Sequence, residues 1–230
     1  VVSPALSPDN SKIAFTRLNP PSVMVLAAES GRRLTFVNPG ASMNATPEFA
    51  PDGRVLFSST VNGSFANLYI AGADGGGLQR LTNVRAGEVE PKANPKTGKD
   101  VVFVSGRSGG RQQLYKMSID GSGVERLTDG SGEASNPSWH PDGQFIAFAW
   151  TAGLEPGNWS IFVMDANTRQ YIQLTRGVRA ENPSWAPDGR HIVFAKTVGR
   201  QVQLWSMLAD GTQQKQLTFT GSNEKPVWTH

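Results

Sequence analysis

Four aspartates, Asp9, Asp52, Asp142 and Asp188, recur at one place in a repeated segment of the sequence. Carboxylates that meet in pairs can act as a general acid and a general base. Each of these aspartates, however, follows a proline and precedes asparagine or glycine, in a separate copy of the segment. Proline presets φ for a turn, aspartate caps the backbone that follows it, and glycine accepts a positive φ. We therefore interpret the four aspartates as turn formers that lie far apart.

The other reactive side chains have no catalytic or metal-binding spacing. His140, His191 and His230 occupy unrelated points of the repeat, so they do not form a metal-ligand pattern. The glycine-flanked serines in Gly121-Ser122-Gly123 and Gly130-Ser131-Gly132 are predicted to lie in turns between strands and not in a nucleophile elbow. The chain contains no cysteine, which excludes a thiolate nucleophile, a cysteine zinc site and a disulfide framework. The sequence therefore predicts a protein that is not an enzyme, with no catalytic residue, no metal and no cofactor.

Composition and charge indicate the fold class and exclude some kinds of partner. The 230 residues include 25 glycines and 15 prolines, with 38% hydrophobic and 18% charged residues, which predicts a single all-β domain with many turns. The net charge of +3 comes from basic residues that are scattered along the chain, whereas nucleic-acid binding usually needs a contiguous basic track. No segment approaches the twenty apolar residues that would span a bilayer. We expect neither nucleic-acid binding nor direct membrane insertion.

The turn segment repeats with a period of 43 to 46 residues, as shown by Pro8, Pro51, Pro95, Pro141 and Pro187. In the third copy Asn94-Pro95-Lys96-Thr97-Gly98 replaces Pro-Asp-Gly. A short strand precedes each turn, and three apolar runs follow it. The first of these runs contains phenylalanine, and the last closes with Leu-Thr. Four short antiparallel strands per repeat are the blade of a β-propeller. The predicted boundaries are residues 1–44, 45–88, 89–134, 135–180 and 181–223, followed by a closing strand over 224–230.

A short strand that opens with proline precedes each turn, and this element occurs six times where the others occur five times. The sixth copy is Pro226-Val227-Trp228. We interpret it as the innermost strand of a last blade whose other strands are supplied from upstream of the N-terminus. The expected fold is a six-bladed propeller with five complete repeats, and a five-bladed ring is the alternative. Trp139, Trp185 and Trp228 recur at one place in this strand and are expected in the core.

The repeat as a whole resembles that of the TolB β-propeller family, in its Trp-x-Pro-Asp-Gly turn, Ile-Ala-Phe strand, Leu-Tyr-x-Met strand and Leu-Thr ending. The resemblance implies a monomeric, non-catalytic scaffold in the periplasm that belongs to the Tol–Pal system. Such a scaffold binds the peptidoglycan-associated lipoprotein Pal and supports envelope integrity, cell division and protein transport. The family contacts other Tol proteins through an N-terminal α/β domain that is absent from this sequence.

Two other function classes remain open. The same repeat is similar to the propellers of prolyl-oligopeptidase-like serine peptidases and of some lyases. In the peptidases the propeller gates access to a separate catalytic domain, which this sequence does not contain. A propeller that binds a small ligand is also possible because the predicted mouth of the central channel is polar.

Candidate binding residues follow from position, because the loops that lead into the innermost strands converge around the channel of a propeller. The resemblance to the TolB family places the equivalents of Met43, Asn44, Ala45, Thr46, Val89 and Glu90 on the face that binds Pal. By their position in the repeat, the same role is expected for Asn136, Glu181, Asn182, Glu224 and Lys225. The competing interpretation is that these polar residues are solvated or hydrogen bonded to neighbouring backbone.

Overall fold

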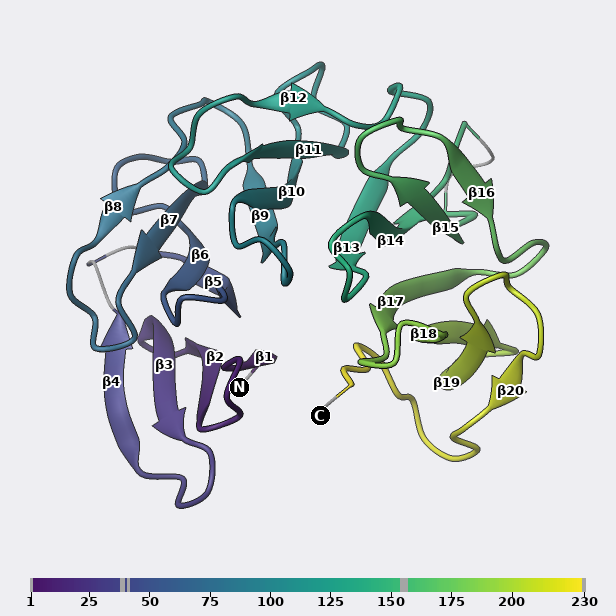
Figure 1. The fold of residues 1–230 in the computed structure, drawn as a ribbon, viewed down its shortest axis with the longest axis horizontal. Helices are drawn as coiled ribbons and strands as arrows, with labels where there is room; N and C mark the ends of the chain where they lie inside the picture. The colour runs from purple at the N-terminus through teal and green to yellow at the C-terminus, as the bar shows by residue number, and fades with distance from the viewer. Residues whose placement is uncertain (1, 38–39, 41, 154–156, 229–230) are drawn as a thin grey trace. The chain divides into compact units, whose positions relative to one another are not determined.

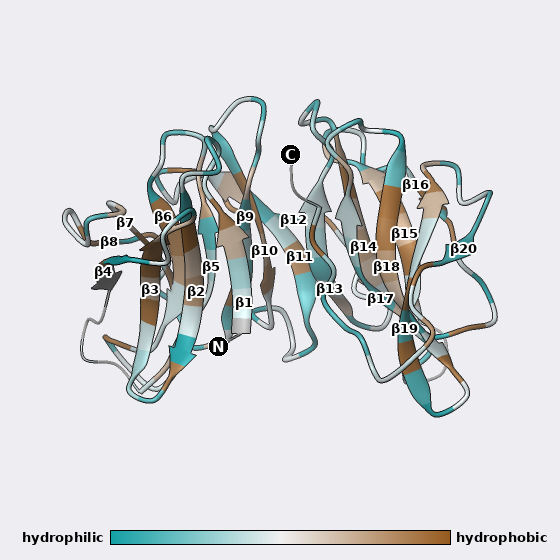
Figure 2. Ribbon diagram, turned by 90° about the horizontal axis from the view of Figure 1, so that it is seen from below, coloured by the Kyte–Doolittle hydropathy of each residue, from teal (hydrophilic) through white to brown (hydrophobic). Residues whose placement is uncertain are grey.

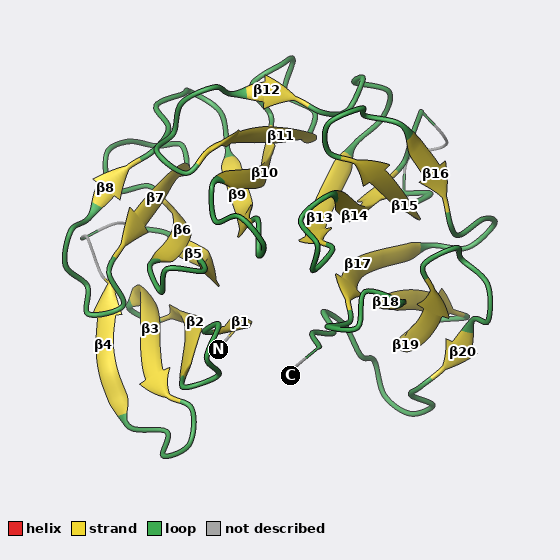
Figure 3. Cartoon of the chain, viewed as in Figure 1, coloured by secondary structure: helices red, strands yellow, loops and turns green. Residues whose placement is uncertain are grey.

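A computed structural model describes residues 2–37, 40, 42–153 and 157–228. This part of the chain contains twenty β-strands and no helix (Figure 3). The strands form five four-stranded antiparallel sheets, each made of four consecutive strands in chain order. The prediction of an all-β protein built from four-stranded blades is confirmed. In the described residues, no helix is long and apolar enough to cross a membrane.

The chain divides into two compact units, residues 1–126 and residues 127–230. The first unit contains three blades (Figure 1). Blade 1 consists of β1 (Val2–Leu6), β2 (Lys12–Leu18), β3 (Pro21–Ala27) and β4 (Arg33–Val37). Blade 2 consists of β5 (Asn44–Phe49), β6 (Val55–Ser59), β7 (Asn67–Ala71) and β8 (Gln79–Arg80). Blade 3 consists of β9 (Glu88–Ala93), β10 (Asp100–Ser105), β11 (Gln113–Ser118) and β12 (Glu125–Arg126).

The second unit contains two blades. Blade 4 consists of β13 (Ala134–Trp139), β14 (Phe145–Trp150), β15 (Ser160–Asp165) and β16 (Tyr171–Gln173). Blade 5 consists of β17 (Ala180–Trp185), β18 (His191–Val198), β19 (Gln201–Leu208) and β20 (Lys215–Gln216). In both units the first strand of each blade forms one edge of its sheet, and we call it the innermost strand.

The repeated aspartates are turn formers, as the sequence predicts. In each first turn the carboxylate accepts the backbone N–H two residues later, at 3.0 Å for Arg54 on Asp52 and at 2.8 Å for Arg190 on Asp188. The degenerate third turn uses a different acceptor, because Asn94, which precedes the proline, accepts the N–H groups of Lys96 at 3.0 Å and Thr97 at 3.1 Å through its Oδ1. A side-chain amide oxygen therefore replaces the carboxylate, and the reversal between β9 and β10 survives without the Pro-Asp-Gly sequence.

The Leu-Thr pair marks the end of the fourth strand of each blade. In blade 1 the pair lies inside that strand, and in blades 2 to 5 it comes directly after it. In blade 2 the Leu81 N–H donates to the Leu68 carbonyl at 2.8 Å, and the Thr82 hydroxyl accepts the Leu68 N–H at 3.0 Å. Thr175 and Thr218 accept the corresponding N–H groups in blades 4 and 5. The prediction that Leu-Thr lies inside the fourth strand is wrong for blades 2 to 5. There the threonine side chain takes over from the backbone ladder, so the strand assignment stops earlier.

The hydrophobic core lies between neighbouring blades within each unit. One buried cluster joins blades 1 and 2 through residues such as Val25 and Phe57, and a second joins blades 2 and 3 through Leu56 and Phe103. In the second unit, Ile161 and Phe194 belong to a cluster that joins blades 4 and 5. Apolar segments are concentrated in the middle strands, while most connecting loops are polar (Figure 2). A blade thus buries its sheet faces by stacking on a neighbour, as propeller repeats must.

The described residues contain five blades, which matches the alternative of five and not the expected six. Residues 224–228 form no strand. An innermost strand needs a second strand to share its backbone hydrogen bonds, and these residues have no such strand beside them in the five sheets. Trp228 is accordingly 38% exposed, whereas Trp139 and Trp185 are each 7% exposed and belong to the core as predicted.

Candidate functional site

Every innermost strand begins with the same β-bulge, just before its proline. Between Ala45 and Glu48 the strand β5 advances three residues while its partner β6 advances two, from Ser58 to Leu56. The same shift occurs in β1, β9, β13 and β17. The residue before the proline takes a left-handed backbone conformation in all five strands. These residues are Ser3, Thr46, Glu90, Asn136 and Asn182, with φ of 53°, 49°, 56°, 54° and 53°.

Lys225 has the same conformation, with φ of 53°, although it precedes no strand. The segment at 224–228 therefore repeats the local backbone geometry of an innermost strand without its sheet. Non-glycine residues rarely adopt positive φ, and such conformations are concentrated at functional sites. One uncommon backbone conformation thus occurs six times at the same position of the repeat, so it is a regular feature of this fold.

The bulge determines which side chains reach the surface. The strands β5, β9, β13 and β17 share one burial pattern, in which the second, third and fifth residues are partly exposed. In a regular strand successive side chains would alternate between faces, but a bulge breaks that alternation and re-aims a side chain. Ala45 and Thr46 are therefore both accessible, and so are Val89 and Glu90. In the second unit Asn136, Glu181 and Asn182 are accessible in the same way.

We call the end of a blade where its innermost strand begins the opening end. The end that carries the aspartate turns is the turn end. At the opening end, Asn44 pairs with Ser59 and Glu88 pairs with Ser105. The predicted residues of the first unit therefore share the opening ends of blades 2 and 3, and Asn136, Glu181 and Asn182 share those of blades 4 and 5.

Two of the bulge side chains connect neighbouring blades. Thr46 Oγ1 accepts the N–H of Glu90 at 3.2 Å, and Asn136 Oδ1 accepts the N–H of Asn182 at 3.4 Å. Further along the same strands, Lys92 Nζ lies 2.6 Å from Glu48 Oε2. These contacts are the ones expected if the polar residues stabilise the backbone. Thr46 and Asn136 thus have a structural role, and the Glu90 and Asn182 side chains remain on the accessible side.

The remaining predicted residues differ in exposure. Asn44 is buried. Its Nδ2 donates to the Pro21 carbonyl at 3.0 Å and its Oδ1 accepts from Ser59 Oγ at 2.7 Å, so these bonds hold the chain in place next to Ala45. Met43 is partly exposed just before β5. Glu224 and Lys225 are exposed and lie after β20.

Glu181 forms a two-point ion pair with Arg179. Its carboxylate oxygens lie 2.5 Å from Nε and 3.2 Å from an Nη atom of the guanidinium. Hydrogen bonding to Glu181 raises the pKa of Arg179 despite partial desolvation, and the charge of Glu224 adds to the effect. Glu224 therefore lies near enough to Arg179 for its side-chain carboxylate to stabilise the charged guanidinium. The sequence shows this pair only as two charges separated by one residue.

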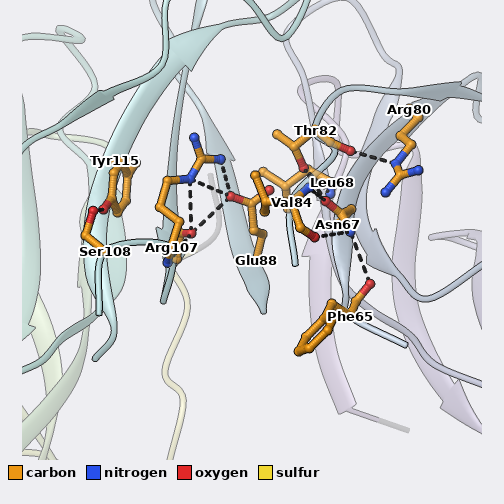
Figure 4. Close-up of polar contacts among 11 residues, drawn as sticks. Phe65, Asn67, Leu68, Arg80, Thr82, Val84, Glu88, Arg107, Ser108 and Tyr115 are labelled. Atoms are coloured by element: carbon orange, nitrogen blue, oxygen red, sulfur yellow. Dashed lines mark hydrogen bonds and ion pairs between the residues drawn. The ribbon is translucent and has the colours of Figure 1, made fainter. Parts of the chain in front are cut away.

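A polar cluster at the opening end of blade 3 is not predicted from the sequence. Glu88 is fully buried, and its Oε1 accepts hydrogen bonds from Ser105 and Arg107. Arg107 lies between Glu88 and the ring of Tyr115 (Figure 4), with its guanidinium carbon 5.1 Å from the ring centroid. The second carboxylate oxygen, Oε2, is buried without a hydrogen-bond partner. The sequence does contain a signal, since Glu88 is a carboxylate where the other copies of the segment have Val1, Asn44, Ala134, Ala180 and Asn223.

The histidines serve the turns. His191 Nδ1 lies 2.7 Å from Asp188 Oδ2, and His140 Nε2 lies 2.9 Å from the Gly189 carbonyl oxygen. His230 lies outside the described residues. Within the described ranges, no group of three or more histidine, aspartate and glutamate side chains is arranged to hold a metal ion.

Comparison with known proteins identifies the fold family. The family model described as the TolB beta propeller domain matches residues 1–230. Among solved structures, TolB from Acinetobacter baumannii is 26% identical with a TM-score of 0.81, and the match covers 98% of this chain and 56% of that one. A structure described as a TolB from Agrobacterium tumefaciens is 20% identical with a TM-score of 0.78, covering 93% of this chain and 79% of that one.

Two enzyme-related matches are weaker. An oligogalacturonate lyase in complex with manganese is 13% identical with a TM-score of 0.71, covering 94% of this chain and 64% of that one, and shows the fold alone. The "uncharacterized peptidase YuxL" of Bacillus subtilis is 29% identical over 114 residues, which is 46% of this chain and 17% of the peptidase. The chain thus spans only part of the length of several relatives. Because the family model matches all 230 residues, the chain belongs to the TolB β-propeller family.

Proposed function

We propose that this chain is a non-catalytic docking scaffold that binds the lipoprotein Pal at the opening ends of its innermost strands. The observation that carries the proposal is the repeated bulge, which holds the backbone before the proline in one conformation in every blade. Membership of the TolB family supports the choice of partner. On this proposal the protein acts as a periplasmic monomer in the Tol–Pal system, supporting envelope integrity, cell division and protein transport. Contacts with other Tol proteins would require an N-terminal domain of the family.

The geometry supports a binding role more than a reaction. Val89 and Glu90 present an apolar and an acidic group side by side on β9, and the Glu90 N–H is fixed by Thr46. Glu181 and Asn182 present a similar pair on β17. A backbone that is already ordered in a strand loses little conformational entropy when a partner binds. Interfaces of this kind gain specificity from a few well-placed polar groups, which is what these positions supply.

A pull-down of Pal from the source organism tests the proposal. Glu90→Lys reverses an accessible charge and should weaken Pal binding without unfolding the blades. Glu29→Lys is the matched control, because Glu29 is exposed in the turn between β3 and β4, at the turn end of blade 1. We expect the control to bind Pal like the wild type. Equal Pal binding by wild type, Glu90→Lys and Glu29→Lys would contradict the proposed site.

The gate of a serine peptidase is the second candidate, because of the 29% identity with part of YuxL. Treating the natural full-length protein with a fluorophosphonate probe distinguishes the two functions. Labelling of a serine outside this chain, together with hydrolysis of a fluorogenic peptide, would support the peptidase gate. Pal binding without labelling would support the docking scaffold.

A further inference from the structure

We propose that the loops at the opening ends of blades 2 and 3 form a second docking surface, which takes an acidic segment of a protein partner that also carries apolar side chains. We call it the arginine patch and define it as Phe65, Arg85, Arg107 and Arg111. It includes none of the bulge residues and does not depend on Pal being the partner. The proposal therefore goes beyond the docking role described above.

Hydrogen bonds of the Asn67 side chain and of the backbone join three loops into one surface. The loop before β7 and the loop after β8 are tied by Asn67, whose Nδ2 donates to the carbonyls of Phe65 at 3.1 Å and Val84 at 3.3 Å. Asn67 Oδ1 also accepts the Val84 N–H at 2.9 Å (Figure 4). The loop after β10 joins them, because the Gly106 N–H donates to the Gly87 carbonyl at 3.2 Å. Residues from three separate segments are thus held together.

The charge on these loops has one sign. Residues 60–66, 83–87 and 106–112 contain Arg85, Arg107 and Arg111 and no carboxylate. The negative charge of the buried Glu88 compensates the positive charge of Arg107. Arg85 and Arg111 are exposed, and neither forms an ion pair with another residue of the described ranges. Two positive charges therefore remain uncompensated at the surface.

Arg107 is fixed in place before any partner binds. Its guanidinium is bonded to Glu88 and Ser105, and its carbon lies 5.1 Å from the Tyr115 ring centroid and 5.5 Å from that of Phe103. Tyr115 is held in turn by its hydroxyl bond to Ser108 Oγ at 2.7 Å. Stacking on aromatic rings and an ion pair both restrain the side chain. The patch thus has a restrained centre, with an exposed arginine on either side of it in the sequence.

Phe65 distinguishes a peptide from other anions. Its side chain is 47% exposed, and it stands on the loop that Asn67 ties to the Arg85 loop. Arginine and aromatic residues are enriched at protein–protein interfaces, and the arginine fork matches a carboxylate. Nucleic acid would need a longer basic track than these three loops supply. An extended segment of alternating acidic and apolar residues fits both features.

Fluorescence anisotropy with a labelled octapeptide of alternating glutamate and leucine tests the patch. An identical peptide with glutamine for glutamate is the probe control. We expect Arg85→Gln/Arg111→Gln to weaken binding of the glutamate peptide roughly 3- to 10-fold, in keeping with two exposed ion pairs, and Phe65→Ala to weaken it as well. Arg176→Gln/Arg200→Gln, which neutralises two exposed arginines of the second unit, should leave the affinity unchanged.

Salt and a nucleic-acid probe complete the test. Raising the ionic strength from about 0.1 M to about 1 M shortens the Debye length from about 10 Å to about 3 Å, so binding of the glutamate peptide should fall. Equal binding of the glutamine peptide, or an unchanged affinity of Arg85→Gln/Arg111→Gln, would overturn the proposal. Tighter binding of an oligothymidine, lost in the same variant, would replace it with a nucleic-acid site. All of these results are independent of Pal binding.

Discussion

His140 Nε2 lies 2.9 Å from the carbonyl oxygen of Gly189, so the first turn of blade 4 touches the first turn of blade 5. A Cβ atom at residue 189 would come within 2.6 Å of the same nitrogen, and Gly189 has a φ of +65°. The His140 ring is also held edge-on against Trp185, with 4.6 Å between centroids. The histidine therefore fills the space that a side chain at position 189 would need.

Gly189→Ala should destabilise the protein through both the backbone and this contact. Alanine in the left-handed region costs about 1 kcal/mol, and overpacking adds about 1–3 kcal/mol. Gly177→Ala is the matched control, because Gly177 has a φ of +68° and no atom within 4 Å of the added Cβ. Urea denaturation should show the larger loss for Gly189→Ala, and His140→Ala in the same chain should restore part of it. Equal losses at the two glycines would show that the contact is unimportant.

Arg107→Met should destabilise blade 3 because it leaves Glu88 as a buried carboxylate without its cation. Breaking such a pair typically costs about 3–5 kcal/mol. Adding Glu88→Gln to the variant should recover much of that loss, since a neutral amide is easier to bury. Arg111→Met serves as the comparison, because Arg111 is exposed. If Arg111→Met lowers the melting temperature as much as Arg107→Met does, the Glu88–Arg107 pair does not have this role.

Thr82→Val should cost about 1–3 kcal/mol, because it leaves the buried N–H of Leu68 without the hydroxyl that accepts it. Thr35→Val removes the equivalent threonine of blade 1, whose hydroxyl instead donates to the Asp74 carbonyl in an exposed setting. That change should cost well under about 1 kcal/mol. Chemical denaturation of the two variants compares a buried and an exposed version of one substitution, and the reverse order would contradict the account of Leu-Thr.

Asp165 should make stability depend on acid pH. A hydrogen bond from Gln144, followed by those from the N–H groups of Thr168 and Asn167, lowers its pKa from the ordinary 3.8 to about 2. Because the folded-state pKa is depressed, the stabilisation is complete above the unfolded value and is lost as the pH falls through about 2. Asp165→Asn should therefore melt below the wild type near neutral pH. The two melting temperatures should converge toward pH 2, and a constant difference would rule out the linkage.

The blades could be predicted from the sequence because their signals are local. A proline, an acceptor side chain and a glycine specify each first turn within a few residues, and Asn94 shows that the acceptor matters more than the exact tripeptide. The number of blades depends instead on pairing between distant segments. Residues 224–228 have the sequence of an innermost strand, yet no second strand in the five sheets pairs with them.

The candidate site can be located from the sequence only by position in the repeat and by resemblance to the TolB family, and not by a shared residue type. The residues before the prolines include serine, threonine, glutamate, asparagine and lysine, so no shared residue type announces a left-handed conformation. The pairing of Glu88 with Arg107 joins residues nineteen positions apart, one on β9 and the other in the loop after β10. Such contacts depend on register, which a single sequence does not specify.

The left-handed residues at the bulges have a consequence for anyone who engineers this protein. Thr46 is β-branched and has a φ of 49°, a combination that the unfolded chain would avoid. Asparagine or glycine would accept such a backbone more readily. At Thr46 this gain is opposed by the loss of the hydroxyl that accepts the Glu90 N–H, but at Glu90, which has a φ of 56°, a gain in thermostability is available at a position proposed to meet a partner. Optimising a variant for heat tolerance alone would therefore tend to erase its recognition surface.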